Sequence, residues 1–146
     1  MTLISIGIML IFIISMIWTW HNLGHIEKPK KILFIIIGWG IIYLLTICLY
    51  HFASPDVIYP SEEMQKTVSG TLVSIFTGLN GLIFLPFVAN LTDKVLEEEI
   101  EKSQVKRKIV IILIIFVVCI FVEKGYMEST QEGIMNIYNE VQNAEK

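Results

Sequence analysis

The chain has 146 residues, of which 54% are hydrophobic and 17% are charged, and its formal net charge at pH 7 is −3. This length predicts a single domain, and the hydrophobic fraction exceeds the roughly 45–50% of a soluble domain. The hydrophobic residues gather in long uncharged blocks, which argues against a water-soluble fold and indicates a lipid bilayer as the surroundings. The basic residues lie beside glutamates, which argues against a nucleic-acid partner.

Four of these blocks predict membrane-spanning helices, because a helix needs roughly 20 apolar residues to cross about 30 Å of hydrocarbon. We expect one membrane domain over residues 1–146, an all-α bundle of four transmembrane helices, with spans at about 3–20, 32–50, 67–91 and 109–122. The fourth block is short, and a re-entrant or buried helix is the alternative there. Lys106 and Lys108 can extend it by snorkelling toward the headgroups, and Tyr126 can anchor its far side.

The first block predicts a retained span rather than a secretory signal, since no basic segment precedes it and no cleavage site follows it. Trp18 and Trp20 come at its end and fit an aromatic belt at the membrane interface. The following His21 and His25 have the i, i+4 spacing of two metal ligands on one helix face. Only Glu27 is near as a third ligand, so we interpret the histidines as an interfacial pair and predict no metal site.

The distribution of positive charge predicts the topology. Eight of the eleven lysines and arginines fall in the loops at 21–31 and 93–108, and three fall in the 51–66 loop and the C-terminal tail. Because positively charged loops stay in the cytoplasm, we expect both termini outside. The usage of Ile and Lys is typical of an AT-rich bacterial genome, so the predicted location is the bacterial cytoplasmic (inner) membrane. The eight basic residues are expected to set orientation and to contact anionic lipid.

The polar segments carry further local predictions. In the 51–66 loop Ser61 is a plausible N-cap, so the third helix should begin outside the membrane near residue 62. The 93–108 segment is expected to be a cytoplasmic helical extension that turns near Ser103. The acidic tail, 123–146, is expected to be exposed to water outside the cell. A short amphipathic helix is predicted in this tail, because the spacing of its apolar residues places them on one helix face. These residues are Ile134, Ile137, Tyr138 and Val141.

The third span differs in composition from the other three. Residues 67–92 contain no charge but include hydroxyls, glycines, asparagines and a proline. On a helical wheel, one arc of about 100° collects the small residues, which are Gly70, Ser74, Thr77, Gly78 and Gly81. Small residues let helix backbones approach closely in lipid. We predict this arc, with Asn80 beside it, to be an oligomer or pore face, and packing within one chain or between copies is the alternative to pore lining.

A pore along this face would narrow toward the cytoplasm. The same arc continues as Phe84 and Val88, which are candidates for a hydrophobic gate, and Pro86 predicts a kink. No Asp, Glu, Lys, Arg or His is expected well inside any span, which argues against proton-coupled transport. No nucleophile–base pair is placed in a span, so we predict no catalytic residues, no cofactor and no enzymatic activity.

The segment GTLVSIF at Gly70–Phe76, together with the four-span plan, resembles RexB-like phage-exclusion proteins. These are small four-span membrane proteins thought to pass ions and depolarise the infected cell. The resemblance implies a self-assembling channel or sensor and transfers no functional residues.

Three functional hypotheses follow. The leading one is a homo-oligomer assembled through the third span that acts as an ion channel or membrane sensor, with a role in phage defence. The alternative is an accessory or immunity-type subunit that binds another membrane or secreted protein through the 134–141 helix or the 51–66 loop. The least favoured is a thiol oxidoreductase using Cys48 and Cys119, because such enzymes typically carry a CxxC pair.

Overall fold

The computed structural model describes residues 3–53, 57–98 and 100–144. Its elements are four helices, α1 (Leu3–Asn22), α2 (Lys28–Ala53), α3 (Glu62–Leu96) and α4 (Lys102–Ala144). No strand occurs in the described ranges, so the all-α prediction is confirmed for them. Residues 54–56 of the predicted outer loop and 145–146 of the predicted tail lie outside the described residues.

The helix boundaries follow from local chemistry. Pro29 lies in the first turn of α2, where its missing N–H costs no hydrogen bond. The predicted cap of α3 is confirmed, because Ser61 Oγ accepts the Met64 N–H at 3.2 Å. The predicted turn near Ser103 is wrong by several residues, since α4 already includes Ser103 and α3 ends at Leu96. Glu98, with φ 58°, is in the left-handed region and ends the helical path there.

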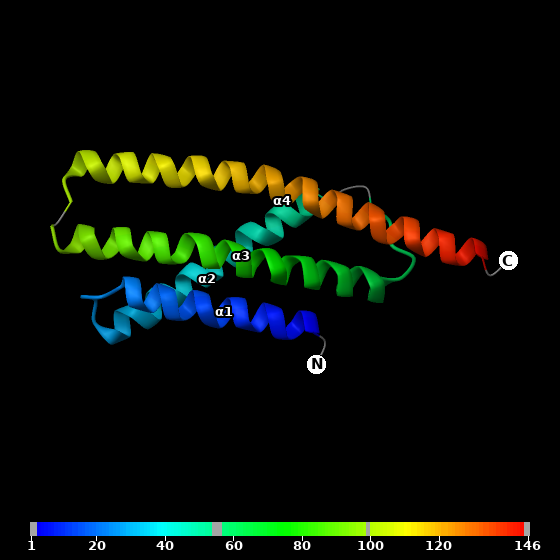
Figure 1. The fold of residues 1–146 in the computed structure, drawn as a ribbon, viewed down its shortest axis with the longest axis horizontal. Coiled ribbons are helices and arrows are strands. Elements are labelled where there is room, and N and C mark those ends of the chain that lie inside the picture. Colours follow the sequence, from blue (N-terminus) through cyan, green and yellow to red (C-terminus); the bar gives the residue numbers. More distant parts are fainter. Residues whose placement is uncertain (1–2, 54–56, 99, 145–146) are drawn as a thin grey trace.

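Helix α3 is the centre of the fold and contacts each of the other three helices, most extensively α1. Figure 1 shows α3 between α1 and α4, with α1 and α3 running in the same direction, α4 in the opposite direction and α2 crossing obliquely. The α1–α2 and α3–α4 connections lie at one end of the molecule, here called the basic end (Figure 1). Toward the opposite end, α2, α3 and α4 form the core through Leu49, Tyr50, Phe76 and Met127.

The predicted separate tail helix is the last part of α4, which is helical without a break through the turns that follow residue 122. The prediction that the tail is exposed from residue 123 is wrong for its first turns, because Glu123, Met127 and Gln131 are buried. The physical reason is that α3 begins at Glu62, before the predicted span at 67–91, and its first half packs against these turns of α4. Beyond them, Ile137 and Val141 are 64% and 53% exposed.

The residues just before α3 fasten onto this part of α4. Tyr59 donates its hydroxyl to Gln131 Oε1 at 3.0 Å. Burial, together with the neighbouring Tyr50, raises the pKa of Tyr59 above its usual value. The neutral phenol is therefore the form that fits the folded state.

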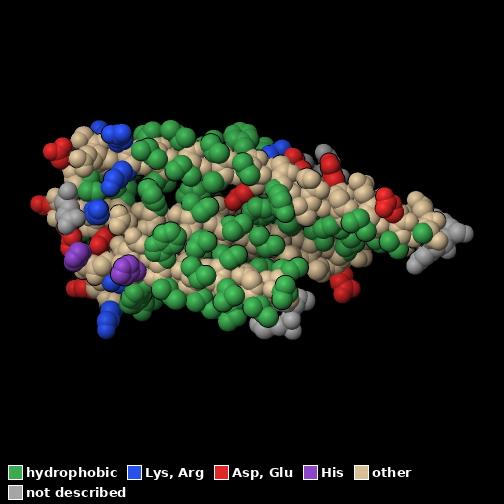
Figure 2. All heavy atoms as spheres, viewed as in Figure 1, with side chains coloured by type: hydrophobic (Ala, Val, Ile, Leu, Met, Phe, Trp, Pro, Cys, Tyr) green, Lys and Arg blue, Asp and Glu red, His purple; other side chains and the backbone are tan. Residues whose placement is uncertain are grey.

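The surface carries the signature of a membrane protein. Figure 2 shows hydrophobic side chains over the middle of the molecule, with charged side chains gathered at the basic end and along the projecting part of α4. Three helices, α1, α2 and α3, are long and apolar enough to cross a membrane. The uncharged run 109–122 forms part of the longer α4, whose second half is polar.

Candidate functional site

The small face of α3, the arc that holds Gly70, Ser74, Thr77, Gly78 and Gly81, has an inner part toward the basic end and an outer part toward the start of the helix. The inner part is covered by other helices of the same chain. A β-carbon at Gly78 would lie 3.2 Å from Ile11 Cγ2 and 3.3 Å from Phe12 Cε2, and one at Gly81 would overlap the Trp39 indole. The Phe12 and Trp39 rings are themselves stacked, with centroids 4.4 Å apart. These two glycines therefore let α1 and α2 approach the backbone of α3.

The outer part of the same face is open. Nothing would meet a β-carbon at Gly70 within 4 Å. Ser74 is half-buried, and its hydroxyl donates to the Gly70 carbonyl at 2.6 Å. Thr77 lies between the two parts and is buried, and its hydroxyl has no hydrogen-bond partner among the described residues. The predicted face is thus divided, and Gly70 and Ser74 are the members that the other helices of the chain leave least covered.

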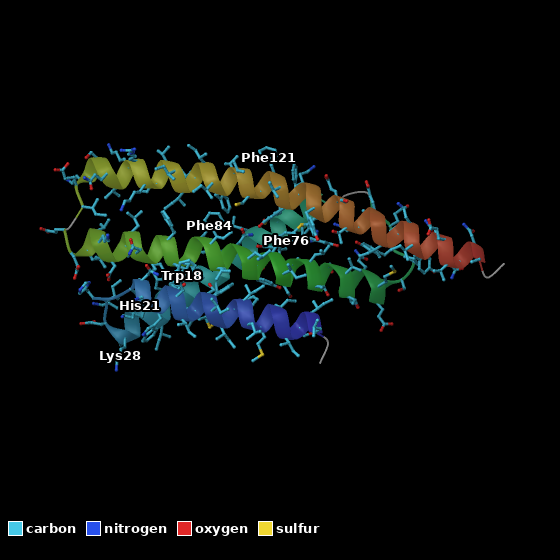
Figure 3. All side chains as sticks on the ribbon, viewed as in Figure 1. Trp18, His21, Lys28, Phe76, Phe84 and Phe121 are labelled. Atoms are coloured by element: carbon cyan, nitrogen blue, oxygen red, sulfur yellow. The ribbon has the colours of Figure 1, made fainter. Side chains whose placement is uncertain are left out.

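The residues predicted as a gate face other helices. Phe84 is buried and packs edge-on against Phe116 of α4, with centroids 5.3 Å apart, and Figure 3 shows Phe84 between α3 and α4. Val88 is exposed and lines a groove with residues of α2. Helix α3 continues through the buried Pro86. Within one chain, therefore, Phe84 acts as a packing residue of the α3–α4 interface.

Asn80 finds its partner on α4. Its Nδ2 donates to Glu123 Oε2 at 3.1 Å, and the two residues are only 6% and 8% exposed. Asn80 belongs to the third predicted span, so the pair places a carboxyl group beside the apolar middle of α3. The expectation that ionisable residues stay clear of the spans does not anticipate this contact.

Two apolar grooves meet at Glu123. The α2-side groove has a volume of about 260 Å³ and is lined by Thr46, Cys48, Asn80 and Glu123 among apolar residues of α2 and α4. The α3–α4 groove has a volume of about 410 Å³, and Phe76, Cys119 and Tyr126 are among the residues that line it with Glu123. Cys48 and Cys119 are free thiols and line different grooves.

The arrangement around Glu123 has a definite chemical capacity. A carboxyl group in apolar surroundings must be protonated, hydrogen-bonded or paired with a cation, because an isolated charge there is costly. Asn80 supplies one hydrogen bond to Glu123. Thr46 also lines the α2-side groove, and its hydroxyl donates to the Ile42 carbonyl at 2.8 Å. A carboxyl group in these surroundings can take up and release a proton.

Sequence reasoning missed Glu123 because it ended the fourth span at the first charge. A signal was nevertheless present, since Asn80 is costly in lipid and requires a polar partner. Glu123 is the first carboxyl group after the fourth uncharged run, and it shares a helix face with Met127 and Gln131 at a spacing of four residues. That spacing indicates a buried face that continues past the run.

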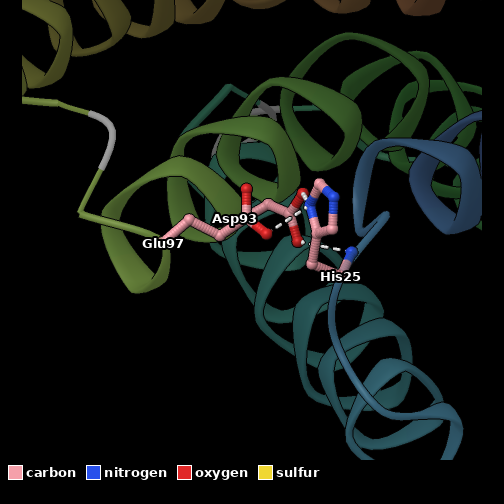
Figure 4. A group of neighbouring side chains, drawn as sticks. All are labelled: His25, Asp93 and Glu97. Carbon is pink, nitrogen blue, oxygen red and sulfur yellow. Dashed lines mark hydrogen bonds and ion pairs between the residues drawn. The ribbon is translucent and has the colours of Figure 1, made fainter.

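A second polar group lies at the basic end (Figure 4). His25 Nδ1 lies 3.2 Å from Asp93 Oδ2 and 2.8 Å from Glu97 Oε1, and the His25 backbone N–H donates to Asp93 Oδ1 at 3.1 Å. Asp93 is buried, whereas the His25 side chain is 67% exposed. The three side chains offer ligand atoms within 4.8 Å of one another, a donor set that could hold a divalent cation.

Sequence reasoning had paired His25 with His21 and found only Glu27 as an acidic neighbour. The structure instead brings His25 to Asp93 of α3, 68 positions later in the chain, and to Glu97 just after that helix. The evident role of this group is to fasten the α1–α2 connection to the end of α3. It lies at the charged end of the molecule, whereas Glu123 lies against apolar side chains of two grooves.

Comparisons with protein-family models, with curated proteins and with solved structures found no match to this chain. Function must therefore be argued from the site, because a helical bundle by itself indicates no activity. The Asn80–Glu123 pair is the group whose chemistry is hardest to explain by packing alone.

Proposed function

We propose that this chain is a multi-pass protein of the bacterial cytoplasmic membrane, with four spans and both termini outside. Three apolar helices support the membrane location, and the position of both basic loops at one end supports the orientation. The fourth span would be the 109–122 run of α4, extended by Lys106 and Lys108 at one side and anchored by Tyr126 at the other.

We further propose that the protein assembles into a homo-oligomer and acts as an ion channel, or as a membrane sensor if the assembly does not conduct. The observation that carries this proposal is the buried Asn80–Glu123 hydrogen bond between two apolar grooves. Ionisable side chains within membrane bundles are costly, and those that persist typically mark ion pathways or proton relays. Glu123 would bind the passing cation or proton, and Asn80 would orient its carboxyl group.

Self-assembly is needed because four helices packed around a filled core leave no lumen, so a pore requires symmetry-related copies. Gly78 and Gly81 are covered by α1 and α2, so the contact between copies would use Gly70 and Ser74 on the outer half of α3. The resemblance of Gly70–Phe76 to RexB-like proteins supports the same proposal and a role in phage defence.

The test is ion flux through the purified protein in liposomes, measured for protons, Na⁺ and K⁺. We expect the wild type to conduct and Glu123→Gln to reduce the flux by about tenfold or more, which corresponds to ~1.4 kcal/mol in the barrier. The matched control is Glu132→Gln, an exposed residue of the same helix. Its flux should equal that of the wild type.

Two outcomes would contradict the proposal. If the wild type passes none of the three ions, the channel is rejected and the sensor remains. If Glu123→Gln and Glu132→Gln conduct equally well, Glu123 has no part in the pathway. Thermal unfolding of both variants in detergent shows whether a loss of flux comes from a loss of fold.

A second candidate function is an accessory or immunity-type subunit that binds another membrane or secreted protein. The observation that favours it is the uncovered apolar face of α4, where Ile137 and Val141 are largely exposed. This function predicts a monomer that is stable only with a co-purifying partner, and the double variant Ile137→Ser/Val141→Ser should lose that partner. A native mass that is a multiple of 16.7 kDa would instead favour the oligomer.

A further inference from the structure

A cavity of about 330 Å³ lies between α1, α3 and the start of α4, near the basic end of the molecule. Part of its wall is apolar and comes chiefly from α3, with Ile83, Pro86, Phe87 and Leu91. Trp18 of α1 completes this part, and Figure 3 shows it toward the same end as His21 and Lys28. The polar part of the wall consists of Asn22, Asn90 and Lys108.

The polar side chains of this cavity are available to a ligand. Lys108 and Asn90 are half-buried, and neither side chain has a hydrogen-bond or ion-pair partner among the described residues. No carboxyl group lines the cavity. The Asn22 Nδ2 donates to the Trp18 carbonyl at 2.9 Å. This bond does not use the Asn22 Oδ1, which can accept a hydrogen bond from a ligand. An ammonium group and an amide that meet at one cavity without an acidic partner favour an anion with several acceptor oxygens.

The surroundings indicate which anion. Lys108 is the last charged residue before the uncharged run 109–122, so its ammonium group lies where an apolar surface meets a polar one. Ile83 and Phe87 are both about half exposed on that apolar surface. A ligand that combines an anionic group at one end with a hydrocarbon chain at the other would therefore match both parts of the cavity wall. Basic pockets between transmembrane helices bind lipid headgroups of this kind.

We propose that this cavity binds an anionic glycerophospholipid, with Lys108 and Asn90 donating to the phosphate and Ile83 and Phe87 contacting an acyl chain. A headgroup that bears choline or ethanolamine would bring a second cation next to Lys108. A glycerol headgroup brings none, and its hydroxyls can donate to Asn22 Oδ1. This site is distinct from the Asn80–Glu123 pair, because its polar lining residues, Asn22, Asn90 and Lys108, line neither of the two grooves at Glu123.

The experiment is a lipid titration of the full-length protein in detergent, followed by native mass spectrometry. The probes are phosphatidylglycerol and phosphatidylcholine with identical acyl chains, and a separate arm adds glycerol 3-phosphate as a competitor. We expect phosphatidylglycerol to bind the wild type more tightly than phosphatidylcholine. Lys108→Gln should weaken phosphatidylglycerol binding about fivefold, the worth of one basic residue near the membrane surface.

The matched control is Lys106→Gln, an exposed lysine of the same helix that does not line the cavity. Its affinity for phosphatidylglycerol should equal that of the wild type. Equal losses for the two variants would mean diffuse surface attraction and would overturn the site. Full competition by glycerol 3-phosphate would mean a soluble phosphate ligand and would overturn the lipid. Asn90→Ala gives an independent reading and should also weaken phosphatidylglycerol binding, because it removes a donor to the phosphate.

Discussion

The two halves of α3 carry the same kinds of small residue and use them differently. In the inner half, Gly78 and Gly81 lie against side chains of α1 and α2, and a β-carbon at either position would be in close contact. In the outer half, Gly70 faces open space, and Ser74 bonds back to its own helix. The contrast shows that a small-xxx-small spacing predicts a close helix approach without predicting which helix will approach.

The two halves are also held by different kinds of contact. Asp93 is buried and accepts the His25 backbone N–H, which ties the α1–α2 connection to α3. At the other end, the Ser61 cap and the Tyr59 hydroxyl add to the core packing of Leu72 and Phe76 against α2 and α4. Mutations in the two halves should therefore have effects of different size and kind.

The largest effect is expected at Gly81. Gly81→Ala places a methyl group within the Trp39 indole, and the ring cannot retreat without disturbing its stacking on Phe12. We expect a loss of about 2–3 kcal/mol in the free energy of unfolding, typical of an overpacked core. Gly78→Ala should cost less, because side-chain atoms of Ile11 and Phe12 can shift. Chemical unfolding in detergent, followed by tryptophan fluorescence, measures both, and equal stability of Gly81→Ala and the wild type would contradict the packing described.

The next effect is expected at Asp93. Asp93→Ala leaves the His25 backbone N–H and the His25 ring without one of their partners. The loss should be about 1–3 kcal/mol, the usual result of removing one partner of a buried hydrogen bond. Hydrogen exchange at residues 23–27 gives the specific readout and should accelerate. The neighbouring Lys94→Ala is the control, and an equal acceleration there would show that Asp93 does not hold the connection.

At Gly70 we expect a small change in stability and a large change in assembly. Gly70→Ala meets no atom within 4 Å and should raise the free energy of unfolding by up to about 1 kcal/mol through helix propensity. Gly70→Leu should keep the fold and lower the native mass in detergent to that of a monomer. If the native mass of Gly70→Leu equals that of the wild type, the outer half of α3 is not the contact between copies.

The smallest effect is expected at Tyr59 and depends on pH. Because the pKa of Tyr59 is raised in the folded state, its contribution is complete below the usual tyrosine pKa of about 10 and is lost as the pH rises toward the folded-state value. The stability of the wild type should thus fall between pH 9 and about 11 more steeply than that of Tyr59→Phe. Parallel curves for the two proteins would show that the hydroxyl is not held in the folded state.

The sequence was sufficient for those parts of the fold that depend on local chemistry. The positions of the helices, the Ser61 cap and the segregation of basic loops follow from residues close together in the chain. The partner of Asn80 and the partner of His25 did not follow, because each lies on another helix, 43 and 68 positions away. Hydrophobic periodicity indicates which face of a helix is buried and carries no information about what covers it.

The extent of the buried face of α4 was not predicted for a related reason. A charged residue normally ends a predicted transmembrane segment. Glu123 is nevertheless buried, because it accepts a hydrogen bond from Asn80 of α3. The buried Met127 and Gln131 extend the same face. An interaction between two helices therefore decided how far the core extends.

The unbroken course of α4 has a mechanical consequence. A helix of 43 residues is about 65 Å long, and it joins the cytoplasmic loop proposed here to a projecting tip at Val141 as one stiff rod. Glu123 is attached to that rod, whereas Asn80 is attached to α3. Any protein that pulls or tilts the tip would therefore stretch the bond between them, and in the topology proposed above an event at the cell exterior would be passed to α3 as a displacement.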